Sequence, residues 1–143
     1  MLLQLFAGSA LVTLTVAIHS VVLGWMMWRL QQATVISRSV LSDAWLLGRI
    51  AIVCVLAHLS EITAWATFYW WWEVMPDPEI AAYFSAVTYA TIGYGDVTPP
   101  NGWRLLAAME GLTGILMCAW SGGFFFAVVR SLRESSPGAK PPA

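Results

Sequence analysis

Residues 88–100 read TYATIGYGDVTPP, and this stretch decides how the rest of the chain is interpreted. Two glycines flank Tyr94, Asp96 follows the second glycine, and Pro99 and Pro100 close the run. Glycine and proline both disfavour helix, so irregular backbone is expected here. The segments on both sides are strongly apolar. The sequence therefore predicts bare, non-helical backbone between two hydrophobic segments.

The composition of the chain is that of a membrane protein. Of its 143 residues, 59% are hydrophobic, only 10% are charged and nine are tryptophan, whereas soluble domains carry roughly 25% charged residues. The net charge of −1, without a basic arm or zinc-binding spacing, argues against a nucleic-acid partner. Cys54 and Cys118 both lie in apolar runs, so we interpret them as packing residues rather than as a disulfide framework.

Three apolar segments exceed the ~20 residues that are needed to cross the hydrocarbon core. We expect spanning helices at residues 1–28, 46–72 and 103–130. The first segment lacks a basic start and a small-residue cleavage site, so we expect a retained helix rather than a signal peptide. A shorter apolar stretch within residues 78–90 predicts a re-entrant helix. The predicted fold class is therefore an all-α membrane protein.

The short helix carries its own start signals. Asp77 is the candidate N-cap, Pro78 suits the first helical position, and Glu79 favours the positive end of the helix dipole. The helix must stop before Gly93, which leaves its partly negative C-terminus at membrane depth, a favourable place for a cation. Non-helical backbone at that depth is tolerated only where it is buried in protein or lines a water-filled path.

The basic residues predict the orientation of the chain, because they collect on the cytoplasmic side of membranes. Only Arg104 lies on the predicted outer side; the other six are Arg29, Arg38, Arg49, Arg130, Arg133 and Lys140. We therefore expect a multi-pass protein of the inner (plasma) membrane with its N-terminus outside. Residues 29–45 would form a cytoplasmic loop, either a short amphipathic helix or a plain solvated loop. Residues 132–143 would form a disordered cytoplasmic tail.

The segment Thr91-Ile92-Gly93-Tyr94-Gly95-Asp96 resembles the selectivity filter of tetrameric potassium channels, in particular small bacterial ion-channel proteins that lack a large regulatory domain. The resemblance covers residues 77–130. It implies a two-helix pore domain at 46–131, with outer helix 46–72, pore helix 78–90, filter 91–96 and inner helix 103–130, preceded by an extra N-terminal spanning helix. It implies that the permeant K⁺ binds the Thr91 hydroxyl and four backbone carbonyls, those of Thr91, Ile92, Gly93 and Tyr94.

The glycines suit this role independently, because carbonyls that point the same way need alternating backbone handedness and glycine adopts φ > 0 readily. By resemblance, Asp96 and the Tyr94 ring hold the filter from behind, the ring near Tyr83 and Phe84. Ala90 departs from the family pattern, in which many members carry a second threonine there. Because the motif occurs once, a ring of carbonyls requires a homotetramer.

The expected function is a potassium-selective channel that has its own copies and membrane lipids as partners and has no enzymatic activity, since His19 and His58 have no nucleophile or metal spacing around them. A less selective monovalent cation channel and a non-conducting regulatory subunit are the alternatives. A glycine-rich re-entrant turn without conduction is the structural alternative.

Gating residues are expected on the inner helix. Gly114 lies near the hinge position that the resemblance implies, and the pair Gly122 and Gly123 is an equally good bend site; close helix packing through small residues is the alternative. Four Phe126 rings would constrict the inner mouth, unless residues 124–126 face lipid. No Arg-rich sensor helix and no ligand-binding domain is visible.

Three ionisable residues lie inside the predicted spans, where such groups are costly and are functional candidates. His58 and Glu61 are three apart and share a helix face, and Glu110 lies at a similar depth. We expect them behind the filter, bonded to the end of the pore helix around Thr88 or Tyr89. The alternative is a polar contact between helices that has no part in gating.

Overall fold

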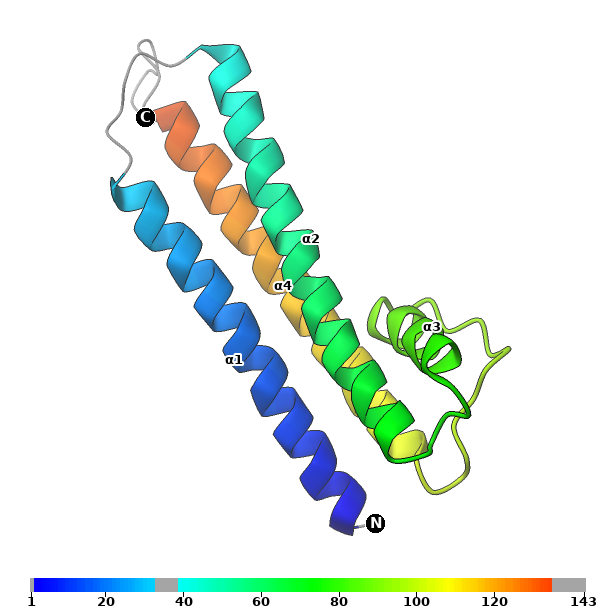
Figure 1. The fold of residues 1–143 in the computed structure, drawn as a ribbon. Helices are drawn as coiled ribbons and strands as arrows, with labels where there is room; N and C mark the ends of the chain where they lie inside the picture. Colours follow the sequence, from blue (N-terminus) through cyan, green and yellow to red (C-terminus); the bar gives the residue numbers. More distant parts are fainter. Residues whose placement is uncertain (1, 33–38, 135–143) are drawn as a thin grey trace, which may run out of the picture.

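The computed structural model describes residues 2–32 and 39–134, and this part of the chain forms four α-helices. Three long helices lie side by side, and one short helix sits beside one end of them (Figure 1). They are α1 Leu2–Gln32, α2 Val40–Trp71, α3 Pro78–Tyr89 and α4 Arg104–Glu134. The three long helices are long and apolar enough to cross a membrane. The fold is thus all-helical, with three candidate spans.

The helices extend further than the hydropathy pattern predicted. Residues 29–32 belong to α1 and residues 40–45 to α2, so the plain solvated loop was wrong for both parts, which are helical instead. α2 begins early because Ser39 caps it through a capping box with Ser42. At the other end α4 continues to Glu134, three residues into the predicted tail. Residues 33–38 and 135–143 lie outside the described residues.

The start of α3 confirms the sequence-based prediction of its cap. Asp77 is the N-cap in extended conformation, its carboxylate accepts a hydrogen bond from the Ile80 N–H at 2.9 Å, and Pro78 occupies the first turn. Capping of this kind stabilises a helix by about 1 kcal/mol. The cap thus fixes where the chain turns back from α2 into the short helix.

α1 packs against both α2 and α4 along the bundle. Two clusters of buried apolar side chains hold the three long helices together. One contains Trp65, Tyr69 and Leu106, all fully buried; the other contains Leu23, Cys54 and Phe124. Gly8 on α1 allows Met109 of α4 to come close, since an added Cβ would lie 2.6 Å from its sulfur. The extra N-terminal helix is therefore an integral part of the fold.

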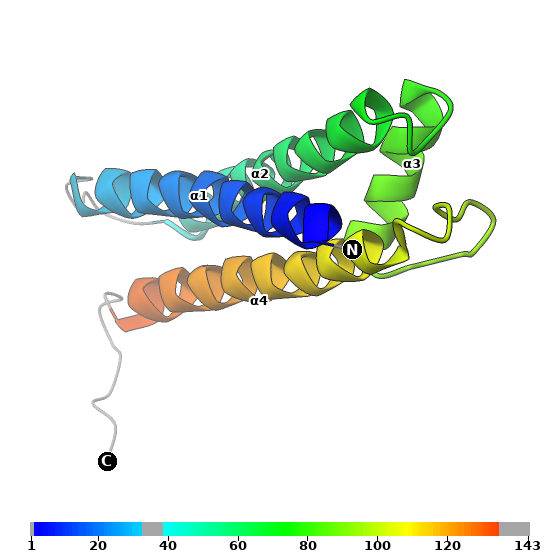
Figure 2. The same ribbon diagram turned by 90° about the horizontal axis from the view of Figure 1, so that it is seen from below.

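Short helix α3 lies at the end of the bundle that also holds the C-terminus of α2 and the N-terminus of α4. Figure 2 shows α3 extending from the α2 end toward α4, with the segment after it looping outward before it returns to α4. α3 packs against both α2 and α4. The TIGYGD segment therefore follows directly from a helix that is fixed between the two others.

Candidate ion-conduction site

The C-terminus of α3 closes in a Schellman arrangement, in which backbone N–H groups beyond the helix donate to its last carbonyls. The Thr91 N–H donates to the Thr88 carbonyl at 2.9 Å, and the Ile92 N–H donates to the Val87 carbonyl at 2.9 Å. Thr91 itself takes the left-handed position, with φ of 59°. That position usually belongs to glycine and is strained for a β-branched residue. The candidate filter thus begins with a strained residue.

Backbone handedness alternates along the candidate filter. Positive φ values occur at Thr91 (59°), Gly93 (54°) and Gly95 (79°), and not at Ile92 or Tyr94 between them. The glycine spacing predicted the second and third of these positions. The first was missed, because nothing in a threonine signals positive φ. The backbone over residues 91–95 thus has the alternation that successive carbonyls need to point the same way.

One side chain of α3 holds the loop that follows the filter. The Tyr83 hydroxyl donates a 2.6 Å hydrogen bond to Asp96 Oδ2, and this bond lowers the pKa of the Asp96 carboxyl below its ordinary value. Phe84 is instead buried within the single chain against Tyr69, with ring centroids 5.2 Å apart. The Tyr94 ring is 69% exposed. A single chain therefore brings Asp96 to Tyr83 but does not bring Tyr94 to Phe84.

The end of α3 reaches well into the depth of the bundle. The Tyr89 carbonyl lies so close to Gly114 of α4 that a Cβ on this glycine would overlap it. Gly114 lies about 15 Å along the axis of α4 from Arg104, at 1.5 Å per residue. Close packing is thus the role that the structure gives Gly114. In contrast, an added Cβ at Gly122 or Gly123 meets nothing within 4 Å.

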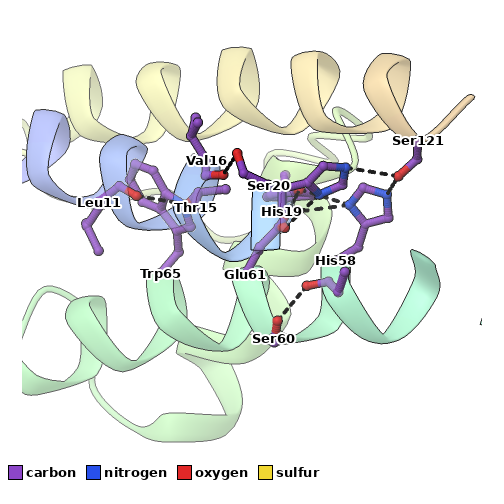
Figure 3. Close-up of polar contacts among 12 residues, drawn as sticks. Leu11, Thr15, Val16, His19, Ser20, His58, Ser60, Glu61, Trp65 and Ser121 are labelled. Carbon is purple, nitrogen blue, oxygen red and sulfur yellow. Dashed lines mark hydrogen bonds and ion pairs between the residues drawn. The ribbon is translucent and has the colours of Figure 1, made fainter. Parts of the chain in front are cut away.

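Side chains from all four helices meet in a buried group at this depth, which we name the histidine–glutamate cluster: His19, His58, Glu61, Tyr89 and Ser121. The His19 Nδ1 atom lies 2.8 Å from Glu61 Oε1, within hydrogen-bond distance. The Tyr89 hydroxyl donates to Glu61 Oε2, and His58 Nδ1 lies 3.0 Å from the same hydroxyl. Figure 3 shows both imidazole rings facing Ser121 of α4. His19 and Glu61 are fully buried.

The third ionisable residue forms a separate group nearer the filter end of α4. Glu110 is fully buried and accepts a hydrogen bond from the Tyr69 hydroxyl at 2.8 Å. Ser85 of α3 donates to its other oxygen at 2.5 Å, and the same hydroxyl lies 3.0 Å from the Ile62 carbonyl. Glu110 therefore joins α4 to α2 and α3.

The predicted polar residues thus fall into two groups. Glu61 contacts the last residue of α3, as the sequence placed it, and His58 lies beside it. Glu110 contacts Ser85, one turn earlier than the residues predicted for it. Sequence reasoning missed His19 as a partner of Glu61. The available signal was a lone histidine in the middle of an apolar span, where ionisable groups are functional candidates.

The phenylalanines of α4 divide between two environments. Phe124 is buried against α1 and α2 residues, so the alternative in which residues 124–126 all face lipid was wrong for it. Phe126 is 69% exposed, and Leu112 and Ile115 are exposed on the same side of α4 by helical spacing. α4 thus presents an apolar face away from the subunit core.

Comparison with known families identifies the class of the protein. The family model described as "Ion channel" matches residues 55–131, more than half of the 143 residues. The chain belongs to this ion channel family, and it is a multi-pass membrane protein with an ion channel domain. Comparison with curated proteins and with solved structures gave no match. The matched range includes about half of α2, all of α3, the TIGYGD segment and most of α4.

Proposed function

We propose that this ion channel is potassium-selective and that it conducts as a homotetramer. In this proposal α3 is a re-entrant pore helix, α4 is the inner helix, and residues 91–96 form the filter. Dehydrated K⁺ binds the carbonyls of the residues that the resemblance implies, Thr91 to Tyr94, and the Thr91 hydroxyl. K⁺ is the transported ion, and no chemical step is involved.

The observation that carries the proposal is the alternating handedness at Thr91, Gly93 and Gly95. A chain of this kind exposes successive carbonyls on one side, which is the arrangement that replaces a hydration shell. The filter starts where α3 ends, and that end lies beside Gly114, about 15 Å into α4. Half the ~30 Å hydrocarbon thickness is the depth that a re-entrant helix would reach.

The exposure of apolar side chains in the single chain supports an assembly of four copies around an axis. Residues 91–96 are exposed, and Ile92 and Tyr94 are apolar or aromatic side chains at 53% and 69% exposure. The exposed apolar face of α4 continues from Leu112 to Phe126. Neighbouring subunits would cover these surfaces, with Phe126 at the inner mouth as a hydrophobic constriction.

Charge placement supports the proposed orientation in the plasma membrane. Arg29 and Arg133 lie in the last turns of α1 and α4, which are at the same end of the bundle (Figure 1). Arg104 and the filter lie at the opposite end. Basic residues face the cytoplasm, which places the N-terminus and the filter outside.

The test is ion flux through purified protein in liposomes, with K⁺ compared with Na⁺. Gly93→Ala should abolish selective K⁺ flux, because alanine at φ of 54° is disfavoured by roughly 1–2 kcal/mol and the carbonyl would turn away. Gly24→Ala is the matched control, since nothing lies within 4 Å of its added Cβ. Selective K⁺ flux in the Gly93 variant would contradict the proposal.

Two other outcomes identify the alternatives. Equal K⁺ and Na⁺ flux in the wild-type protein would indicate a less selective monovalent cation channel. Intact protein without flux of either ion would indicate a non-conducting subunit that assembles with other channels.

A further inference from the structure

We propose that His19, His58 and Glu61 form a binding site for a divalent transition-metal cation, of the class of Zn²⁺, that fastens α1 to α2 behind the pore helix. The site is independent of the ion pathway, and it concerns the side chains of the histidine–glutamate cluster rather than the filter carbonyls.

The first argument is charge. Glu61 is fully buried, and within the described residues its ion-pair partners are the two histidines, at 2.8 Å and 3.5 Å, with no lysine or arginine among them. A buried carboxylate is costly unless it is paired with positive charge or coordinates a metal. Neutral imidazoles would supply hydrogen bonds but no charge, so the positive charge must come from a proton on a ring or from a bound cation. A divalent cation between them would supply it.

The second argument is geometry. One ligand atom from each of the three residues lies within 4.8 Å of the other two. Tetrahedral Zn²⁺ with bonds of about 2.0–2.1 Å keeps neighbouring ligand atoms roughly 3.3 Å apart. His19 Nδ1 lies 2.8 Å from Glu61 Oε1, and His58 Nδ1 lies 3.5 Å from the other carboxylate oxygen, Oε2; these two distances lie on either side of that value. Small rotations of the side chains would therefore close a coordination shell.

The third argument is the hydrogen count at the far side of the two rings. The Nε2 atoms of His19 and His58 both lie 3.2 Å from Ser121 Oγ. A serine hydroxyl has two lone pairs but only one hydrogen. If both Nδ1 atoms bind a metal, both Nε2 atoms carry hydrogen, and Ser121 accepts both bonds. If both Nδ1 atoms carry hydrogen instead, neutral rings present two bare Nε2 atoms to one hydroxyl hydrogen.

Without a metal, the other contacts require hydrogen on both Nδ1 atoms, so the Ser121 contact is then satisfied only if one ring is protonated. His19 Nδ1 faces a carboxylate oxygen, which can only accept when it is ionised. His58 Nδ1 faces the Tyr89 oxygen, whose own hydrogen goes to Glu61. With two neutral rings, the Ser121 contact therefore fits only the metal-bound arrangement. Metal-ligating histidines commonly donate their other N–H to such an outer partner.

The ligand set also selects the class of ion. Two imidazoles and one carboxylate suit Zn²⁺ and similar transition metals, whereas Ca²⁺ and Mg²⁺ prefer oxygen ligands. His58 is the partly exposed member, with 18% of its side chain accessible in the single chain. Tyr89 places an oxygen next to the site for a fourth position, directly or through water. The bound ion would join α1 and α2 at the end of α3.

The experiment uses the purified full-length protein in detergent with any affinity tag of histidines removed. After chelator treatment the protein is equilibrated with Zn²⁺ or Co²⁺, desalted and analysed for metal content, and the visible spectrum of the Co²⁺ form reports its ligands. We expect one ion per chain in the wild-type protein. His19→Gln and His58→Gln should each weaken binding more than the 10–100-fold that loss of an outer partner such as Ser121 costs.

Two controls distinguish this site from other donors. Glu110→Gln changes the other buried carboxyl, which no histidine contacts, and should retain one ion per chain. Cys118→Ser removes an exposed thiol of α4 and should also retain it. Wild-type protein without bound metal, or His19→Gln and His58→Gln variants with wild-type affinity, would overturn the proposal.

A second measurement covers variants that assemble poorly. Zn²⁺ should raise the melting temperature of the wild-type and Glu110→Gln proteins, because the ion binds only the folded state. It should not raise that of His19→Gln. No shift in the wild-type protein would contradict the proposal. Neither readout depends on ion flux, so the metal site and the proposed channel function are tested separately.

Discussion

At the scale of single residues, the candidate filter is marked by backbone strain. Thr91 holds φ of 59° in a position where glycine is usual. Non-glycine residues in such conformations cost about 1–3 kcal/mol, and they persist only where the surroundings impose them. Here the two hydrogen bonds that close α3 impose the positive φ on Thr91. The strain therefore lies at the residue whose carbonyl and hydroxyl are proposed to bind K⁺.

The Tyr83–Asp96 hydrogen bond predicts how the filter loop responds to acid. Because this bond lowers the pKa of Asp96, its stabilising effect is complete above the ordinary carboxyl pKa of about 3.9. It is lost as the pH falls through the lowered value. Tyr83→Phe should therefore move the acid-induced loosening of residues 91–100 to higher pH. Hydrogen exchange of these amides, measured as a function of pH, checks this.

The control for that prediction is Asp96→Asn, which removes the titrating group. Adding Tyr83→Phe to Asp96→Asn should shift the acid transition no further, since the two residues act through one bond. Equal shifts in both backgrounds would mean that Tyr83 acts on the loop by another route.

Residue chemistry also sets the limit of what the sequence could predict. That His58 and Glu61 share one helix face could be predicted from their spacing, because helical geometry is local. The pairing of His19 with Glu61 could not, because it depends on how α1 docks in three dimensions. Likewise, the glycines of the candidate filter predicted positive φ at Gly93 and Gly95. The strain at Thr91 was not predictable, because it comes from the closure of α3.

At the scale of elements, the helices and the N-cap of α3 were predictable, and the other helix ends were less so. Apolar length predicted the three long helices, and Asp77 with Pro78 predicted the start of α3. Hydropathy located the apolar part of α2, but the helix continues to Val40 because Ser39 and Ser42 cap it there. A helix ends where its backbone is capped, and this can lie well beyond the hydrocarbon core.

The contact between α3 and α4 predicts that alanine at Gly114 lowers stability, whereas alanine at a glycine outside the contact does not. Gly114→Ala should destabilise the protein by about 1–3 kcal/mol, because the added Cβ overlaps the Tyr89 carbonyl. Gly48→Ala in α2 meets nothing within 4 Å and should be neutral or stabilising by up to about 1 kcal/mol. Thermal unfolding of both variants in detergent provides the comparison. A neutral Gly114→Ala would show that α3 and α4 separate easily.

At the scale of the whole molecule, α1 completes the packing of a bundle that α2, α3 and α4 alone would leave open. It contributes His19 to the histidine–glutamate cluster, and Leu23 and Met26 to a core shared with α2 and α4. The family match begins at residue 55 and therefore excludes α1. Because α1 touches both α2 and α4, a change in its docking would reach α3 through Glu61 and Tyr89.

The arrangement of helix ends makes the orientation of the molecule testable. The start of α1, the end of α2 and the start of α4 share one end of the bundle with α3 (Figure 1). If the basic residues face the cytoplasm, this end faces outward. In a background without Cys54 and Cys118, a cysteine introduced at Pro76 should react with an impermeant maleimide in intact cells. A cysteine at Glu134 should react only after permeabilisation. Both sites are exposed, so accessibility within the subunit does not limit either reaction. The reverse pattern would place the TIGYGD segment on the cytoplasmic side and exclude the proposed outer filter.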